Sequence, residues 1–551
     1  MRLDDARRLT GPNLYGPRPL VLLELFLDEG ETAETVRAEV QSRLDPLRAR
    51  VGLPPVPLRT VRTQPNWVAL AHDAPLDEML VGAELVELAS LPTGEPGEGL
   101  ADQLAEQRNP RLPALEAEAR RRNIPFLWDD ETVSLGHAKR SQHFKRNELP
   151  ALDGIDWSSL GAIPIAMVTG TNGKTTSTRL LARMAKEAGL SVGMTSSDEV
   201  TIAGRTLHEG DWTGPAAARE VLRSPEVQIA ILETARGGIL RRGLACDAID
   251  VALLTNITDD HLGAYGINTL EDMAQVKAVT ARVARHVVLN ARDPLLVSLS
   301  LHQRGEGRGE GPTVTFFADV DGGAPQPTHP HQVIARNHTL VTIRDGVETQ
   351  LLPISAIPIT FNGTARHNVE NALGATAAAE ALGIPHSAII RALTTFTAAD
   401  NPGRGETWTR DGVTLFLDFA HNPDGVGSAL LVARSLLGEA GHLTIITGSA
   451  GDRTDVELTA ISERIRAAKP SAIYVRELEH YLRGRQPDEV PVFFERALNA
   501  IRATSEVDAL TSAIATSSPG DVIALLVHVD RDEVRSFLEH TGWGRPAAPV
   551  R

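Results

Sequence analysis

From Ile163 onward the chain alternates short apolar runs with segments of helical spacing, and this alternation is its strongest constraint on the fold. Four runs, IPIAMVTG, VQIAILE, DVALLTN and HVVLN, each end in a small or polar residue. Buried strands separated by helices are typical of a parallel sheet, which collects ligands at the carboxyl ends of its strands. A second series follows Pro402, with VTLFLDFAH, HLTIITGS, SAIYVREL and VIALLVH. We therefore expect an α/β protein with two such sheets.

The first 150 residues have a different, mixed α+β pattern. Residues 20–28 and 67–72 are strand-like, whereas residues 32–44 have helical spacing. A chain of 551 residues is too long for one hydrophobic core. We expect an N-terminal α+β domain over residues 1–150, a central parallel-sheet domain over 151–403 and a C-terminal Rossmann-like domain over 404–551.

Composition narrows the class of protein. The net charge is −16, which argues against a general binder of nucleic acid or anionic membranes. The single cysteine, Cys246, excludes an internal disulfide framework and a cysteine metal cluster. The N-terminus lacks an apolar signal core, and no 18 uninterrupted apolar residues occur. We expect a soluble cytoplasmic protein.

The segment VTGTNGKTTSTRLL places a Gly-Lys-Thr triplet between an apolar run and a helical pattern. Gly170 and Gly173 let the backbone turn tightly enough to aim its N–H groups at a phosphate. Lys174 supplies a charge for the β/γ oxygens and Thr175 a hydroxyl for Mg²⁺. Val168 stands where the full Walker pattern has a glycine. An ordinary turn is the alternative, but the strand–loop–helix context favours a phosphate site.

The second run ends in an acidic residue and is followed by a group of arginines. Glu233 ends VQIAILE, where phosphate-loop enzymes place a metal-binding carboxylate; the alternative is that it caps the next helix. In the sequence ARGGILRR that follows, Arg236, Arg241 and Arg242 are candidates for binding an anionic substrate. The alternative for these arginines is an ordinary solvated face.

The segment TNITDDHL carries His261 directly after the third run, where a neutral imidazole could bind a metal. A lone histidine is more often structural. Lys277 lies four residues after Met273 and seven after Leu270, so a helix places it on the apolar face. A neutral buried amine takes up CO₂ to become a carbamate, an acidic metal ligand, although periodicity alone favours a lysine whose amine reaches water.

Polar residues also mark the later segments. His367, Asn368 and Asn371 lie near the start of an alanine-rich helical stretch, where their side chains could read a nucleobase or cap the helix. Arg404 of NPGRGE could reach a phosphate, and Asp418 of DFAHNPDG a ribose hydroxyl. Each of these signals is weak by itself.

Taken in order, TGTNGKTT, Glu233, TNITDDHL, Lys277, HNVEN, PGRGE, DFAHNPDG and GDRTD resemble the Mur ligase family. The resemblance runs from about Ile163 almost to the C-terminus. Within that family, ETARGGILRRGL, INTLEDMAQVK and YLRGRQPDE resemble the Mur-type half of cyanophycin synthetases. RRLTGPNLYG and VSLGHAKRSQHF resemble their first domain and the stretch that leads into an ATP-grasp domain. Here SQHFKRNELPALDG leads straight into the phosphate loop, which leaves no room for that domain.

The resemblance implies ATP-dependent amide-bond formation through an acyl phosphate, with Mg²⁺. The implied catalytic residues are Lys174, His261, Lys277 and Arg404. Thr175 and Glu233 would bind one Mg²⁺, and His261 with carbamylated Lys277 a second. The implied ATP site comprises Gly170, Thr171, Asn172, Gly173, Lys174, Thr175, Thr176, Asn290, Asp293, Asn368, Asn371, Arg404 and Asp418. The substrate candidates are Arg236, Arg241, His421, Asn422, Arg483 and Arg485.

The partners implied are a small-molecule or peptide carboxylate and an amino-acid amine, with no nucleic acid or membrane. A separate ATP-grasp ligase and a homo-oligomer stay open. One alternative function is a catalytically degenerate Mur module that acts as a scaffold, but Lys174, Glu233, His261 and Lys277 are all retained. A plain phosphate-loop NTPase is another, but it leaves PGRGE and DFAHNPDG unexplained.

Overall fold

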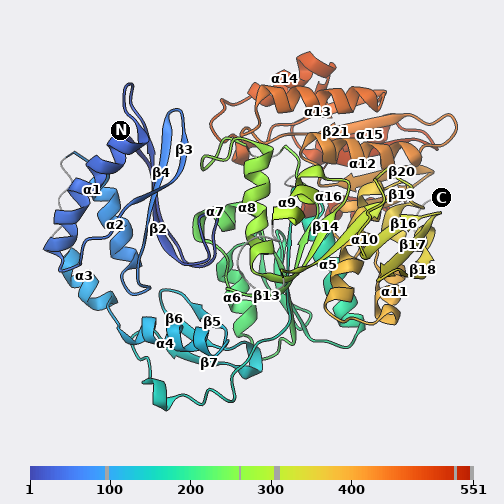
Figure 1. Cartoon of the computed structure of the whole chain (residues 1–551). Coiled ribbons are helices and arrows are strands. Elements are labelled where there is room, and N and C mark those ends of the chain that lie inside the picture. Colours follow the sequence, from blue (N-terminus) through green and yellow to red (C-terminus); the bar gives the residue numbers. More distant parts are fainter. Residues whose placement is uncertain (93–98, 260–261, 303–310, 527–529, 546–551) are drawn as a thin grey trace.

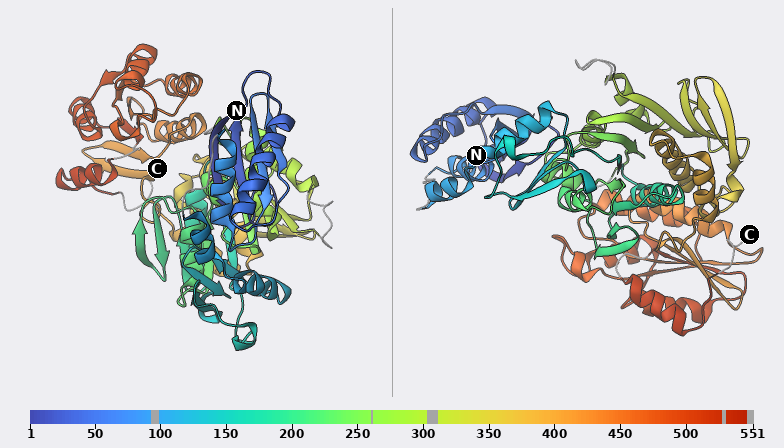
Figure 2. Two further views of the ribbon diagram at one scale, coloured as in Figure 1. Left: turned by 90° about the vertical axis from the view of Figure 1, so that its left-hand side faces the viewer. Right: turned by 90° about the horizontal axis from the view of Figure 1, so that it is seen from below.

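The computed structural model of the protein describes residues 1–92, 99–259, 262–302, 311–526 and 530–545. Its fold is mixed α/β, with parallel strands in its two larger sheets, as the sequence predicted. Three parts are visible along the chain in Figure 1: an N-terminal part in blue, a central part in green and yellow, and a C-terminal part in orange and red. Figure 2 shows the N-terminal and C-terminal parts against different sides of the central part.

The N-terminal part begins with a four-stranded antiparallel sheet in the order β1-β2-β4-β3. Its strands are β1 (Arg2–Leu9), β2 (Leu20–Phe26), β3 (Arg59–Gln64) and β4 (Trp67–Asp73). Helices α1 (Ala33–Arg50) and α2 (Met79–Ser90) pack on it through Val36, Val40 and Leu85. The remaining elements are α3 (Leu100–Gln107), α4 (Arg111–Arg121), β5 (Phe126–Trp128), β6 (Thr132–Leu135) and β7 (Gln142–Lys145).

The central sheet has eleven strands in the order β11-β10-β9-β12-β8-β13-β14-β15-β16-β17-β18. The strands from β9 to β16 in that order run parallel: β9 (Val192–Thr195), β12 (Ile229–Glu233), β8 (Ile165–Thr169), β13 (Ile249–Leu254), β14 (Ala284–Asn290), β15 (Thr313–Asp319) and β16 (His331–Arg336). Antiparallel strands extend both edges: β10 (Glu199–Ile202), β11 (Arg205–Glu209), β17 (Thr339–Arg344) and β18 (Val347–Pro353).

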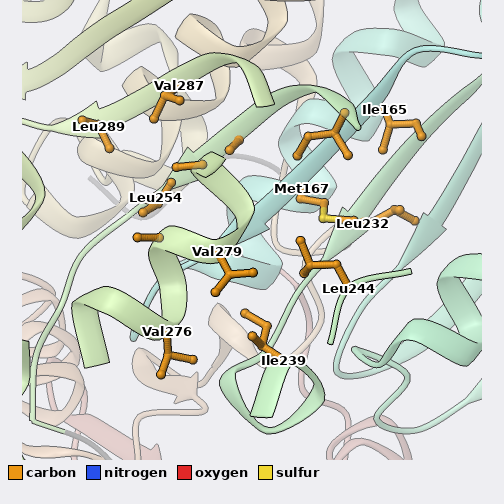
Figure 3. Packing of buried hydrophobic residues seen from close by; sticks show 14 of the residues in the cluster. Ile165, Met167, Leu232, Ile239, Leu244, Leu254, Val276, Val279, Val287 and Leu289 are labelled. Carbon is orange, nitrogen blue, oxygen red and sulfur yellow. The ribbon is translucent and has the colours of Figure 1, made fainter. Parts of the chain in front are cut away.

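Helices cover both faces of the central sheet, because its strands are apolar on both sides. One face packs against α5 (Lys174–Glu187), α10 (Arg366–Ala381) and α11 (His386–Thr395). The other packs against α6 (Pro215–Arg223), α7 (Arg236–Arg242), α8 (Leu270–Arg282) and α9 (Pro294–His302). Figure 3 shows part of the second core, a cluster that contains Val276 and Val279 of α8 together with Leu254 and Met167 of the sheet. The two cores hold the loops at the strand ends in fixed positions.

The C-terminal sheet has six strands in the order β19-β20-β24-β21-β22-β23, and only β19 is antiparallel to its neighbour. Its strands are β19 (Arg404–Arg410), β20 (Val413–Asp418), β21 (Leu443–Thr447), β22 (Ala472–Val475), β23 (Ile501–Arg502) and β24 (Val522–Leu526). Its helices are α12 (Pro423–Ser435), α13 (Asp455–Ala467), α14 (Glu489–Leu498), α15 (Glu506–Thr516) and α16 (Arg531–His540). Within the described ranges, no helix is both long and apolar enough to cross a membrane.

Candidate functional site

The phosphate loop connects β8 to α5, and the loop that follows β13 forms hydrogen bonds with it. Gly170 and Gly173 both have positive φ, at 150° and 81°. The side chain of Thr255 donates to the carbonyl of Asn172 at 2.6 Å, and Asn256 Oδ1 accepts from the Asn172 amide at 2.8 Å. A Cβ on Gly170 would lie 1.9 Å from Thr255 Oγ1, so only glycine fits there. The loop is therefore held in one shape, with Gly173 at the N-terminus of α5.

A cavity of about 1560 Å³ opens beside this loop and extends between the central and C-terminal parts. Most of the residues predicted from the sequence line it: Gly170, Thr171, Asn172, Gly173, Lys174, Thr175, Thr176, Glu233, Arg236, Arg241, Lys277, Asn290, Asp293, Asn368, Asn371, Arg404, Asp418, His421 and Arg483. Asn422 and Arg485 are outside this lining. His261 falls outside the described residues.

Glu233 lies at the carboxyl end of β12, 2% exposed, and its Oε2 accepts from the Ser197 amide at 3.2 Å. Burial raises the pKa of its carboxyl group, although Lys174 and Arg404 oppose this shift. The residue does not cap the following helix, because Ala235 is the N-cap of α7. Thr175 Oγ1 lies 3.0 Å from Ser197 Oγ, and the Thr175 side chain also hydrogen-bonds the Glu233 carboxylate.

These oxygen donors fit Mg²⁺. The described ranges hold no cluster of three histidine, cysteine or acidic side chains that could bind a metal. Mg²⁺ commonly uses one or two carboxylates together with water and substrate phosphates, so it needs no such cluster. Glu233 and Thr175 meet that requirement beside a phosphate loop.

Lys277 is buried on α8, 4% exposed, and its Nζ donates to the carbonyl of Gly170 at 2.7 Å. The alternative interpretation required the Lys277 amine to reach bulk water, and in the structure it does not. Lys174 Nζ donates to the carbonyl of Thr171 at 2.8 Å. Both lysines thus contact the backbone of the phosphate loop. Lys277 does so from the neighbouring helix α8, and Lys174 from the end of the loop itself.

Side chains from β14, from the turn before α9 and from α10 also line the cavity. Asn290 Nδ2 donates to the Thr255 carbonyl and to Glu370 Oε2. Asp293 accepts from three backbone amides, and burial raises the pKa of its carboxyl group. Burial also lowers the pKa of His367 to about 4, which keeps its imidazole neutral.

The two asparagines of HNVEN do not cap α10, whose N-cap is Ala365. Asn371 Nδ2 donates to Asn368 Oδ1 at 3.1 Å, and its own Oδ1 accepts from Ser177 at 3.3 Å. The same oxygen lies 2.1 Å from where a Cβ on Gly173 would stand. Asn371 therefore supports the phosphate loop as well as lining the cavity.

The C-terminal part supplies Arg404 and Asp418 to the cavity lining. Arg404 Nη2 lies 3.4 Å from Thr175 Oγ1 and 3.3 Å from Ser197 Oγ. Asp418 accepts from the Gly405 amide at 2.8 Å, and burial raises the pKa of its carboxyl group to about 6. Arg404 thus already reaches the loop across the cavity.

The predicted substrate residues differ in where they lie. Arg236, Arg241, His421 and Arg483 line the cavity. Asn422 instead pairs with the loop, because its Nδ2 donates to Asn172 Oδ1 at 2.8 Å. Arg485 donates to the Arg453 carbonyl and pairs with Asp455 at 2.6 Å, so the structure does not bring it into the cavity.

Sequence reasoning missed Ser197 and Asp198, which follow β9. Asp198 pairs with Arg404 at 2.5 Å, and these contacts lower the pKa of its carboxyl group to about 2 despite burial. The signal was available, because SVGMTSSDEV is another apolar run that ends in small and polar residues. Its position at the carboxyl end of a parallel strand is where ligands gather.

Two family descriptions match the chain. The Mur ligase middle domain matches residues 168–379, and the Mur ligase glutamate ligase domain matches residues 403–526. The cyanophycin synthetase of Crocosphaera subtropica is 35% identical over 373 residues, which are 64% of this chain and 40% of that protein. The chain thus spans about 40% of the length of this relative.

Two solved structures show the same fold at low identity. A structure of E. coli FolC with ADP is 18% identical, with a TM-score of 0.53, and the match covers 69% of this chain and 90% of that one. A bifunctional folylpolyglutamate synthase/dihydrofolate synthase with Mn, AMPPNP and L-glutamate bound is 19% identical, with a TM-score of 0.51 over 68% and 89%.

Proposed function

Because the chain belongs to the Mur ligase family through residues 168–379 and 403–526, we propose that the protein is an ATP-dependent ligase that joins a carboxylate to an amine. The observation that carries this proposal is the convergence on one loop of Lys174, Glu233 and Arg404, from the central and C-terminal sheets. A phosphate loop with a buried carboxylate alone would fit an NTPase. The arginine contributed by a second sheet favours a reaction enclosed between two parts of the molecule.

In the proposed reaction a carboxylate oxygen of the acid attacks the γ-phosphorus of ATP, and the bond to ADP breaks. The resulting acyl phosphate is attacked at its carbonyl carbon by the amine. Phosphate leaves with one oxygen from the acid, and the amine loses a proton as the amide forms. The energetic difficulty is the approach of two anions, which a preorganised cationic site overcomes by neutralising and aligning them.

Lys174 and the amides of the loop would bind the β- and γ-phosphates, and Arg404 would neutralise the γ-phosphate from the opposite side. Asp418 would accept from a ribose hydroxyl, while Asn290, Asp293, Asn368 and Asn371 would lie around the base. The C-terminal part would cover the site and exclude water, which prevents loss of the acyl phosphate by hydrolysis.

Thr175 and Glu233 would hold one Mg²⁺, and His261 with Lys277 as its carbamate a second. When bound, the ions supply positive charge that neutralises the phosphates. Lys277 supports this role by its burial, because a carbamate there would be sheltered from water. The Thr175 hydroxyl, which hydrogen-bonds the Glu233 carboxylate, supports the first site.

The acid is an amino acid or peptide carboxylate, with Arg236 and Arg241 as its candidate contacts. The amine is that of an amino acid or peptide, with His421, Asn422, Arg483 and Arg485 as its candidate contacts; Asn422 and Arg485 are the weaker two, since both lie outside the cavity lining. The same proposal divides the chain at residues 150 and 403 and allows a separate ATP-grasp ligase to make the acid substrate.

Phosphate release with ATP, Mg²⁺ and a panel of amino acids and short acidic peptides tests the proposal. We expect release only when an acid and an amine are both present, and none from a Lys174→Ala variant. Release with neither would indicate an NTPase. No phosphate release with any member of a broad panel, from a protein that still binds ATP, would favour a scaffold that has lost catalysis.

A further inference from the structure

One carboxylate of the central part contacts two arginines of the C-terminal part. Asp198 lies in the turn between β9 and β10, with its side chain 16% exposed. It pairs with Arg404 at 2.5 Å and with Arg531, the first residue of α16, at 3.0 Å. Arg404 and Arg531 come from opposite ends of the C-terminal sequence, so this single side chain joins two separate elements of that part to the central sheet.

The turn that carries Asp198 also touches the nucleotide site. Ser197, its neighbour, donates its amide to Glu233 and shares a hydrogen bond with Thr175. Arg179 of α5 lies 3.3 Å from Asp198 and holds the carboxylate from the phosphate-loop side. Any movement of Asp198 relative to the loop would therefore disturb these contacts, which makes the turn a rigid platform.

An aromatic ring also contacts the guanidinium groups of Arg404 and Arg531. Phe419 follows Asp418 at the end of β20, and its ring centroid lies 4.5 Å from Arg531 Cζ and 5.8 Å from Arg404 Cζ. Arg404 thus contacts both the carboxylate and the ring, which limits its side-chain freedom. Confinement removes side-chain freedom that a long, charged residue would otherwise lose on binding its ligand.

We propose that Asp198 is the positioning residue that docks the C-terminal part on the phosphate loop and turns Arg404 toward Thr175 before nucleotide binds. The docking role is argued from the contacts among Asp198, Arg404 and Arg531 and does not require the proposed function. The benefit to phosphate binding rests on the proposed function, because it requires that Arg404 contacts the nucleotide. The two consequences are therefore measured separately.

Glu199 provides a matched control. It is the next residue, and its Oε1 pairs with Arg179 at 2.9 Å, but no contact with Arg404 or Arg531 is found among the described residues. Asp198→Asn removes the charge that joins the two parts, whereas Glu199→Gln removes a neighbouring charge that does not. Asp198→Glu keeps the charge and serves as the conservative variant.

Docking is measured by electron spin resonance distances between labels on Val347→Cys and Val456→Cys in the whole 551-residue chain without nucleotide. These positions are 68% and 78% exposed in the central and C-terminal parts, and the native Cys246 is buried. We expect one narrow distance distribution for the parent and Glu199→Gln, and a broader, longer one for Asp198→Asn. A distribution as narrow as the parent's in Asp198→Asn would overturn docking by this residue.

Arg531→Gln is the second variant, chosen in case Asp198→Asn does not fold. It removes one C-terminal partner of Asp198 instead of Asp198 itself. It should broaden the distances in the same way, and a narrow distribution in a folded Arg531→Gln protein would also count against docking. These distances require no catalytic activity, so they stand even if phosphate release fails.

The orientation of Arg404 is measured by calorimetric binding of ADP with Mg²⁺. We expect Asp198→Asn to weaken binding about tenfold, Asp198→Glu to recover most of the affinity, and Glu199→Gln to match the parent. Unchanged ADP affinity in Asp198→Asn would overturn the orienting role. Equal weakening by Glu199→Gln would reduce it to a general effect of local charge.

Discussion

Two glycines at opposite ends of α5 provide a controlled test of the phosphate-loop geometry. Gly173 precedes the helix with φ at 81°, and Gly189 follows it with φ at 83°. A Cβ on Gly173 would lie 2.1 Å from Asn371 Oδ1, whereas one on Gly189 would meet nothing within 4 Å. Substituting alanine at each position therefore imposes the same backbone strain but only one steric conflict.

The expected magnitude follows from the contacts of Asn371. Left-handed backbone costs an alanine about 1–2 kcal/mol at either position. At Gly173 the amide must also move away from Asn368 and Ser177 and lose two hydrogen bonds, each worth about 0.5–1.5 kcal/mol. We expect Gly173→Ala to be destabilised by about 1–3 kcal/mol more than Gly189→Ala. For a domain of about 150–250 residues, a difference of about 2 kcal/mol, the middle of this range, lowers Tm by roughly 4–8 °C.

Thermal unfolding and ADP titration measure the two consequences. Gly173→Ala should unfold at a lower temperature than Gly189→Ala and bind ADP at least tenfold more weakly, because Asn371 and the loop move together. Gly189→Ala should keep the parent's affinity. Equal Tm values for the two variants would refute the packing of Asn371 under the loop, and full ADP affinity in Gly173→Ala would refute the loop's role in phosphate binding.

Three further predictions concern individual site residues. Glu233→Gln should abolish the dependence of ADP affinity on Mg²⁺, because a neutral amide is a poor ligand; a retained dependence in calorimetry would count against the metal site. Lys277→Ala should stop phosphate release, and added acetate or formate should partly restore it by replacing the carbamate. Absence of rescue in a folded variant would remove the carbamate. ADP affinity should fall as pH decreases through about 6, where Asp418 takes up a proton and ceases to be an anionic acceptor, and Asp418→Asn should lose this dependence; an identical pH profile in the variant would exclude Asp418.

The parallel strands and the residues at their ends were predictable from the sequence. Their apolar runs are short and end in polar residues, so β8 and β12 and the positions of Lys174 and Glu233 followed from pattern alone. The edge strands were not predicted. β11 and β18 are mostly exposed, so they lack the apolar signal that marks a buried strand.

Contacts between distant segments were beyond reach of the sequence. Lys277 was placed correctly on the apolar face of its helix, but its partner is a backbone carbonyl 107 residues away. Asp198 and Arg531 are 333 residues apart, and a single sequence gives no pairing signal over that distance. Asn371 was expected near the base, and its contact beneath Gly173 depends on a close approach that only coordinates reveal.

The central claim is that the phosphate loop activates a carboxylate, and the fate of the acid's oxygen tests it most directly. An acid from the panel that supports phosphate release is labelled with ¹⁸O in its carboxylate and turned over with ATP and an amine. Attack by the carboxylate on the γ-phosphorus predicts one ¹⁸O atom in each phosphate released, detected by mass spectrometry. Phosphate without label would show that water attacks ATP, and would contradict the account.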